Sequence, residues 1–280
     1  MTSDKKDPIF DIKSDYLKTF YIGEGVFRTF FFANLNCDNL LLTMPDLGEN
    51  FLKKSPFCKN YIYIFHSLIS YTLAYKKNAF KNYDTFFCVG RHHVTELENF
   101  FKENKIIEKK RLLRIGYFKL DEIIKTRKST SINNNQILIA PTWGSDNIIN
   151  SYCEEIIEKL LKLNYKIILR PHPMSIKLDH KKLSEIDEKF SSNDNFSLSK
   201  KDDNSQDYLK SEIIISDWSG AALEFCLGLN RSAIFIDTPQ RVRNKEYLNN
   251  KSIQEKTFEY SVRGKLGQII KTNEIHKITE

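Results

Sequence analysis

Short apolar runs alternate with segments of helical periodicity in the second half of this sequence. We expect strands in the runs at residues 137–140, 166–169, 196–198, 213–215 and 233–236. Helices are expected between them, at about residues 151–162, 179–189 and 220–229. Several of the runs are apolar throughout and rich in Ile, which is typical of strands buried on both faces of a parallel sheet. The alternation therefore predicts that residues 136–240 form the core of a doubly wound α/β domain.

The first half has a similar but less regular pattern. We expect strands at residues 19–22, 39–43, 61–65, 85–89 and 112–115, and a helix at residues 93–102. The polar segment 125–135 ends in three asparagines and predicts a linker. We therefore expect two domains, residues 1–128 and 129–280, the second ending in a mostly helical tail from about residue 254.

Composition excludes some classes of protein. The 280 residues are 41% hydrophobic, which is enough for ordinary cores, and carry a net charge of +7. No apolar stretch approaches the roughly 18 residues that span a bilayer, and the first residues do not read as a signal peptide. The five cysteines form no CxxC pair and predict free thiols in a reducing compartment. No histidine pair has metal-ligand spacing, so no protein-bound metal is expected.

Basic residues are concentrated in one segment. Residues 102–128 hold ten Lys and Arg against four Asp and Glu. Such a surplus suits an anionic ligand or a lipid surface, although a solvated loop and helix would explain it equally well. No nucleic-acid-binding motif accompanies it. We therefore expect a cytoplasmic protein with no nucleic-acid partner and, at most, peripheral membrane contact.

Two polar segments directly follow predicted strands of the second half. They are residues 170–173 (RPHP) and residues 216–220 (SDWSG). In parallel sheets, ligands bind just beyond the carboxyl ends of the strands. A cation, an imidazole, two hydroxyls and a carboxylate are thus expected at one sheet edge, which indicates a phosphate-binding site.

The segment 216–220 joins a strand to a helix. Free N–H groups at a helix N-terminus attract an anion, and the hydroxyls of Ser216 and Ser219 can donate to phosphate oxygens. Gly220 would let a ligand approach the backbone closely. An ordinary N-cap by Ser or by Asp217 explains the same residues without any ligand.

The segment 170–173 is a stiff turn because its two prolines fix the backbone. Arg170 offers phosphate a planar fork of donors. His172 can donate to phosphate or protonate a leaving oxygen. The alternative is a rigid turn that carries a surface histidine.

Two further candidates follow strands elsewhere. His66 ends a strand of the first half, and it could serve as a base opposite His172 if the two halves face one another. A structural histidine is the simpler interpretation of such a residue, and His92 and His93 are weaker candidates. Thr142, at the end of the first strand of the second half, can donate to a phosphate, whereas the neighbouring indole is expected in the core.

The order of these segments resembles a known family. APTW (140–143), RPHP, SDWSG and RGKLGQII (263–270) follow one another as in the CDP-glycerol glycerophosphotransferase family, of teichoic-acid polymerase type. His66 and the segment 116–121 (GYFKLD) resemble the family's HGT and GYPRND segments. The resemblance spans roughly residues 60–280.

The resemblance implies a GT-B fold, in which two Rossmann-like domains with parallel sheets face a cleft that holds the active site. It implies transfer of a glycerol phosphate, or a related polyol phosphate, from a CDP-activated donor to a hydroxyl of a cell-surface polymer or lipid-linked acceptor. It also implies peripheral attachment to the inner face of the plasma membrane, and no cofactor.

Site residues follow from the same resemblance, which makes His66 the base. The residues matched to donor-phosphate segments are Arg170, His172, Ser216, Asp217 and Ser219, together with Arg263 and Gly264 of a C-terminal RG loop. The chain departs from the family where Ser67 and Leu68 replace the last two residues of HGT, and where Gly220 replaces a serine. A GT-B glycosyltransferase that uses a nucleotide sugar, a non-catalytic anion-binding relative and a nucleic-acid binder are the alternatives.

Overall fold

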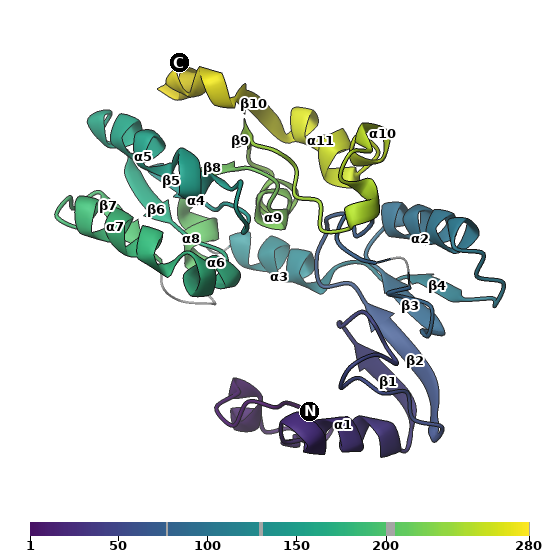
Figure 1. Ribbon diagram of the computed structural model, residues 1–280. Coiled ribbons are helices and arrows are strands. Elements are labelled where there is room, and N and C mark those ends of the chain that lie inside the picture. Colours follow the sequence, from purple (N-terminus) through teal and green to yellow (C-terminus); the bar gives the residue numbers. More distant parts are fainter. Residues whose placement is uncertain (77, 129–130, 200–204, 280) are drawn as a thin grey trace. The chain divides into compact units, whose positions relative to one another are not determined.

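The computed structural model describes residues 1–76, 78–128, 131–199 and 205–279 (Figure 1). It divides into two compact units: the first comprises Met1–His66 and Tyr75–Ile115, and the second Ser67–Ala74 and Gly116–Glu280. Within the described ranges, each unit contains one sheet whose paired strands all run parallel. The predicted α/β class with two parallel sheets is confirmed.

The first unit is built around an aromatic core. Its sheet has the order β1 (Cys37–Leu42), β2 (Cys58–Ile64), β3 (Thr85–Cys88) and β4 (Arg111–Arg114), and its helices are η1 (Pro8–Asp11), α1 (Gly25–Asn34) and α2 (Arg91–Glu103). The rings of Tyr63, Phe80 and Phe86 have no exposed surface and contact one another edge-on or tilted. The strand expected at residues 19–22 is absent. Phe20 and Tyr21 are largely exposed there, and only a single bridge joins Tyr21 to Thr2.

The second unit carries the longer sheet, in the order β10-β9-β8-β5-β6-β7. Its strands are β5 (Asn133–Ile139), β6 (Lys166–Leu169), β7 (Phe196–Leu198), β8 (Ser211–Ser216), β9 (Ala233–Asp237) and β10 (Gly267–Lys271). Its helices are α3 (Phe118–Arg127), α4 (Ile148–Ser151), α5 (Cys153–Lys162), α6 (Pro173–Leu178), α7 (His180–Phe190), α8 (Ser205–Lys210), α9 (Gly220–Leu229), η2 (Lys245–Tyr247), α10 (Lys251–Gln254), α11 (Phe258–Leu266) and η3 (Thr272–Thr279).

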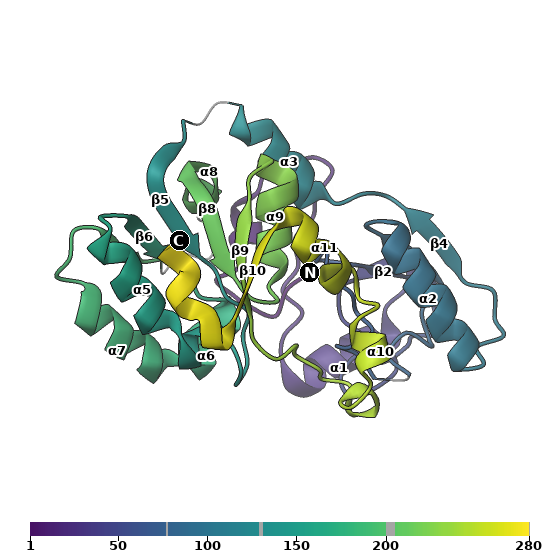
Figure 2. The ribbon, with the colours of Figure 1, turned by 90° about the horizontal axis from the view of Figure 1, so that it is seen from above.

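Both faces of this sheet are covered (Figure 2). On one face, β-branched strand residues pack with α5, α7 and η3, which contribute for example Ile156, Ile186 and Ile275. On the other face, α8 and α9 supply Tyr208 and Phe225. Burial on two sides explains why the strands are apolar runs and not alternating patterns, and it leaves the carboxyl ends of the strands as the edge where polar groups gather.

The C-terminal tail was expected to be mostly helical, but it contributes an edge strand. Residues of β10 pair with β9 in parallel, Gly267 opposite Ala233. A Cβ on Gly267 would lie 1.8 Å from the carbonyl oxygen of Ala233, so only glycine allows the tail to approach β9 here. The apolar part of β10 is too short to be recognised as a strand from the sequence. Its pairing partner, β9, is also distant in the sequence.

The domain boundary was predicted after residue 128, but the main segment of the second unit starts at Gly116 and includes α3. Helix α3 packs on α9, where a Cβ on Gly228 would lie 2.6 Å from a methyl group of Ile123. Arg127 Nη1 also donates to the carbonyl of Gly228 at 2.9 Å. The predicted linker at 125–135 thus starts within α3 and ends within β5, and its residues 129–130 lie outside the described part of the chain. None of the helices described is both long and apolar enough to cross a bilayer.

Candidate functional site

The carboxylate of Asp217 ties the end of β8 to the loop that follows β5. Its Oδ1 accepts the backbone N–H groups of Thr142 and Trp218, each at 2.7 Å, and its Oδ2 accepts that of Ile148 at 3.3 Å. Burial raises the pKa of Asp217, and these donors oppose the rise by stabilising the ionised form. Only 1% of the surface of Asp217 is exposed, and its carboxylate is bonded to backbone N–H groups of the two loops. Its predicted contact with a donor phosphate is therefore not supported.

The hydroxyls of Ser216 and Ser219 differ in their surroundings. Ser216 has no exposed surface, and its Oγ donates to the carbonyl of Ala140 at 2.7 Å. Its one proton is therefore committed within the core, and the prediction that Ser216 donates to a phosphate is wrong for this conformation. Ser219 is half-buried and caps α9, its Oγ accepting the N–H of Ala221 at 3.3 Å. That bond uses a lone pair and leaves the hydroxyl proton of Ser219 for another acceptor.

Gly220 begins α9, and the chain itself occupies the space beside it. A Cβ at this position would lie 2.8 Å from Oγ of Ser67 and 3.5 Å from a methyl group of Ile69. The close approach that glycine permits here is therefore made by residues of this chain, whereas the prediction assigned it to a ligand.

Arg170, after β6, carries a buried nitrogen that lacks a partner. Its guanidinium lies over the ring of Tyr208, with 4.6 Å between Cζ and the ring centroid. Its Nη1 is buried and makes no hydrogen bond with any described residue. A buried charged donor without an acceptor is costly, and phosphate oxygens would satisfy it.

His172 is held as a neutral imidazole. Its Nδ1 accepts the N–H of Met174 at 3.0 Å and so caps α6, where Pro173 is the first residue. Burial, and then the positive charges of Arg241 and Lys119, lower the pKa of His172 to about 4. With Nδ1 used as an acceptor, the ring proton sits on Nε2. His172 can therefore donate a hydrogen bond to a phosphate, but at neutral pH it is a poor source of a full proton.

Trp143 links His172 to an arginine that the sequence interpretation did not include. The indole stacks on the imidazole of His172, with 5.9 Å between centroids and 28° between planes. The guanidinium carbon of Arg241 lies 3.2 Å from the centroid of the Trp143 ring, and that of Arg243 lies 5.5 Å from it. Trp143 is only half-buried and borders the site, although it was expected in the core. Thr142 is also half-buried, and its role as a phosphate donor stays a prediction.

Arg241 and Arg243 could have been found from the sequence. They lie in the loop after β9, the neighbour of β8, and therefore at the same carboxyl edge as the two recognised segments. Applying the same rule to the predicted strand at 233–236, the fifth in the second half, would have found them. No group of three or more His, Cys, Asp or Glu residues capable of holding a metal ion occurs in the described ranges.

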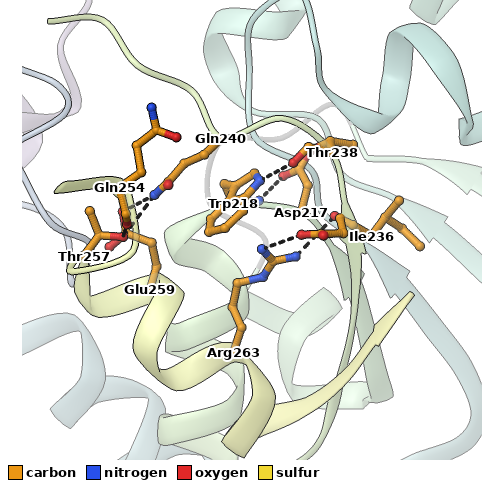
Figure 3. Close-up of polar contacts among 10 residues, drawn as sticks. Asp217, Trp218, Ile236, Thr238, Gln240, Gln254, Thr257, Glu259 and Arg263 are labelled. Carbon is orange, nitrogen blue, oxygen red and sulfur yellow. Dashed lines mark hydrogen bonds and ion pairs between the residues drawn. The ribbon is translucent and has the colours of Figure 1, made fainter. Parts of the chain in front are cut away.

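Arg263 was matched to a loop that contacts the donor, but it lies inside α11 and is buried (Figure 3). Its Nη1 pairs with Oδ1 of Asp237 at 3.2 Å, and its Nη2 donates to the carbonyl of Ile236 at 3.4 Å. Its guanidinium also stacks over Trp218, 3.7 Å from the ring centroid. Through these contacts, Arg263 joins α11 to β9 and to the segment that follows β8. Gly264 is an exposed helical residue, so neither forms the predicted phosphate loop.

The segment 67–74 is fastened to the N-terminus of α11. The backbone N–H of Ser70 donates to Oε2 of Glu259 at 2.9 Å, and Oγ of Ser70 accepts the N–H of Phe258 at 2.7 Å. The carbonyl of Leu73 accepts two backbone N–H groups from the loop after β9. This segment is therefore part of the second unit.

The polar network around Glu259 continues into the loop after β9. Figure 3 shows the side chain of Gln240 directed at Thr257 and Glu259, to which its Nε2 donates at 3.0 Å and 3.5 Å. Because Glu259 and Thr257 are buried, these bonds fix the start of the loop that carries Arg241.

His66 directly precedes the segment 67–74 and belongs to the first unit. Partial burial lowers the pKa of His66 below its usual value, although part of the ring stays exposed. The imidazole is therefore neutral at neutral pH and able to accept a proton. Its role as a base stays a prediction.

The second unit thus combines a parallel α/β sheet with cationic and N–H donors at the carboxyl edge of its strands, an arrangement that suits phosphate groups. The sequence matches the family model of CDP-glycerol:poly(glycerophosphate) glycerophosphotransferase over residues 71–241, more than half of the chain. The chain therefore belongs to this glycerophosphotransferase family, as the motif order predicted. No curated protein sequence matches it.

Two solved structures to which the chain is similar are a wall teichoic acid polymerase and a UDP-GlcNAc 2-epimerase. The wall teichoic acid polymerase TagF is 18% identical, with 80% of this chain and 59% of that chain covered and a TM-score of 0.47. UDP-GlcNAc 2-epimerase from Methanocaldococcus jannaschii is 14% identical, with 78% and 62% covered and a TM-score of 0.45. The chain thus spans less than two thirds of either protein.

Proposed function

We propose that this protein transfers a glycerol phosphate, or a related polyol phosphate, from a CDP-activated donor to a hydroxyl of a cell-surface polymer or lipid-linked acceptor. Family membership supports the reaction class. The observation that carries the proposal is the partnerless, buried Nη1 of Arg170 at the carboxyl edge of the second sheet. Such a donor fits an anionic ligand, and a diphosphate supplies the acceptor oxygens that it lacks.

In the proposed reaction, the acceptor hydroxyl attacks the distal phosphorus of the donor in line. A new P–O bond forms, the bond from this phosphorus to the bridging oxygen breaks, and CMP leaves with the electron pair. Arg170, the hydroxyl of Ser219 and the N-terminus of α9 stabilise the charge on the phosphates. His172 contributes a neutral Nε2–H donor. Thr142 is a further candidate donor through its hydroxyl.

His66 is proposed to take the proton of the acceptor hydroxyl. The lowered pKa of His66 supports this role, because a neutral imidazole is the form that accepts a proton. The proton count then balances: the acceptor loses one proton to His66, and CMP leaves without needing one.

We also propose that the protein works in the cytoplasm, attached peripherally to the inner face of the plasma membrane. The basic surplus of residues 102–128 supports attraction to anionic lipids. Co-sedimentation with vesicles of phosphatidylglycerol and of phosphatidylcholine tests this point: binding only to the anionic vesicles, lost at high salt, is expected, and equal recovery with both would contradict it.

A donor screen tests the reaction. The purified protein is incubated with CDP-glycerol, CDP-ribitol, UDP-sugars and CMP-sugars, together with a short poly(glycerol phosphate) acceptor, and nucleotide release and product mass are measured. We expect CMP release and acceptor growth by one polyol phosphate with a CDP-polyol. Growth by a sugar from a UDP- or CMP-sugar would assign the protein to glycosyl transfer instead.

A further inference from the structure

Arg241 is packed onto the loop that follows β5. Its guanidinium carbon lies 3.2 Å from the ring centroid of Trp143. The next residue, Gly144, has a φ of +124°, and a Cβ there would lie 3.4 Å from Cδ of Arg241. The positive φ of Gly144 permits the turn beside which Arg241 packs. The side chain of Arg241 is therefore held in a defined direction before any ligand arrives.

Arg241 has no anionic partner in the described part of the chain. Neither a carboxylate nor a carbonyl is paired with its guanidinium, whose contacts are Trp143 and the like charge of Arg243. Burial and Arg243 lower the pKa of Arg241 to about 10, a value that still keeps it charged. Two neighbouring arginines without a counter-ion create a positive potential that favours an anion.

Two other arginines of the second unit have acceptors within the protein for their terminal nitrogens. Arg263 pairs with Asp237, and Nη1 of Arg231 donates to three backbone carbonyls, including that of Leu209 at 2.8 Å. At the carboxyl edge of the sheet, Nη1 of Arg170 has no acceptor, and the guanidinium of Arg241 has no hydrogen-bond or ion-pair partner among the described residues. Arg170 follows β6 and Arg241 follows β9, so the two cations approach this edge from different strands.

We propose that Arg241 binds the CMP-side phosphate of the donor and stabilises the charge that develops on it as CMP leaves. This inference rests on the proposed transfer reaction. CMP is a phosphate monoester whose second pKa is about 6, so it departs as a stable anion and needs a counter-charge more than a proton. His172 is neutral and poorly suited to protonate it. The guanidinium that contacts the same indole supplies the missing positive charge.

Three variants test the inference. Arg241→Gln removes the charge, and Arg241→Lys keeps the charge but not the planar fork. Lys245→Gln, at the exposed first residue of η2 four positions further on, is the matched control for loss of one positive charge. For each, we would measure the dissociation constants of CMP and of cytidine by calorimetry, kcat and KM with CDP-glycerol, and the melting temperature.

Arg241→Gln is expected to weaken CMP binding about tenfold to a hundredfold, because a charge-assisted hydrogen bond is lost. Binding of cytidine, which lacks the phosphate, should not change. The value of kcat should fall by at least as much as the affinity for CMP, since the charge grows in the transition state. Arg241→Lys should lie between the wild type and Arg241→Gln, and Lys245→Gln should match the wild type.

The inference and the proposed reaction fail in different ways. If the wild type turns over CDP-glycerol and Arg241→Gln retains CMP affinity and kcat, the role of Arg241 is wrong and the reaction stands. If the wild type binds CMP through Arg241 but releases none from any CDP-polyol, the reaction is wrong and Arg241 remains a nucleotide-phosphate ligand. Equal losses of affinity for CMP and for cytidine would overturn the inference. It would also be overturned if Arg241→Gln failed to fold while Arg241→Lys folded and had wild-type kinetics.

Discussion

The carboxylate of Asp217 accepts the backbone N–H of Thr142 at 2.7 Å, which joins two loops 75 residues apart in the sequence. This bond connects the ends of β5 and β8, neighbouring strands of the second sheet. The bond holds the segments that follow these two strands next to each other at the carboxyl edge of the sheet. The side chains that remain available at this edge are Arg170, His172 and Ser219, and the loop after β9 adds Arg241.

Ser216→Ala and Ser219→Ala should separate stability from binding. Loss of the Ser216 hydroxyl leaves the carbonyl of Ala140 without its donor, so the free energy of unfolding should fall by about 1–2 kcal/mol with CMP affinity unchanged. Ser219→Ala should weaken CMP binding by about tenfold, and Ser219→Thr, which keeps the hydroxyl and the cap, should restore it. Urea titrations and calorimetry measure both quantities. A large loss of CMP affinity in folded Ser216→Ala would return that residue to the binding site.

Arg170→Met should weaken donor binding without weakening the fold. The partnerless Nη1 of Arg170 is a cost in the free protein, so an apolar side chain of similar length should leave the free energy of unfolding unchanged or raise it. Binding of CDP-glycerol should fall about tenfold to a hundredfold, because a charged hydrogen bond to phosphate is lost. A destabilised variant with normal affinity would show that Arg170 serves the fold.

His172→Asn should reduce the loss of unfolding free energy that the wild type shows as the pH falls. The pKa of His172 is lowered from 6.5 to about 4 in the folded chain. Between these values the unfolded chain binds more protons, so the wild type loses stability as the pH falls, by about 1–3 kcal/mol in all. Asparagine keeps the cap of α6 and does not titrate. Urea unfolding at pH 7, 5.5 and 4 should show a smaller loss in the variant, and parallel profiles would contradict the assignment.

His66→Ala should lower kcat and leave the affinity for the CDP-polyol donor unchanged. Loss of a general base typically costs about 10²–10⁴-fold in rate, whereas the proposed ligands of the donor phosphates belong to the second unit. Rates of CMP release and calorimetric titration of CDP-glycerol report the two quantities, and His66→Gln serves as a variant of closer size. Full turnover in the alanine variant would remove the base assignment.

Gly267→Ala and Gly264→Ala form a matched pair for the tail. A Cβ on Gly267 would lie 1.8 Å from a backbone oxygen of β9, so this variant should lose at least about 3 kcal/mol or release β10. Gly264 lies in α11 with its nearest neighbouring atom 3.9 Å from such a Cβ, and alanine there should add about 0.5–1 kcal/mol. Similar unfolding midpoints for the two variants would argue against β10 as an edge strand.

Much of the architecture could be predicted from local patterns. The predicted strands at 166–169 and 196–198 and the helix at 220–229 coincide with β6, β7 and α9. A short apolar run marks β6, and the caps Ser219 and Asn230 mark the two ends of α9. The tail strand β10 and the assignment of α3 to the second unit were missed. Both depend on partners far away in the sequence, Ala233 and Gly228.

The amino-acid sequence by itself determined the α/β class, the family and the sheet edge where the candidate phosphate ligands lie, because the alternation of strands with helices and the short motifs are local properties. Only the tertiary structure decided which polar groups at that edge face outward. Ser216, Asp217 and Arg263 make hydrogen bonds to other groups of the chain, whereas Nη1 of Arg170 and the guanidinium of Arg241 make none with the described residues. The physical reason is that a side chain's availability depends on which distant groups burial brings within hydrogen-bonding distance.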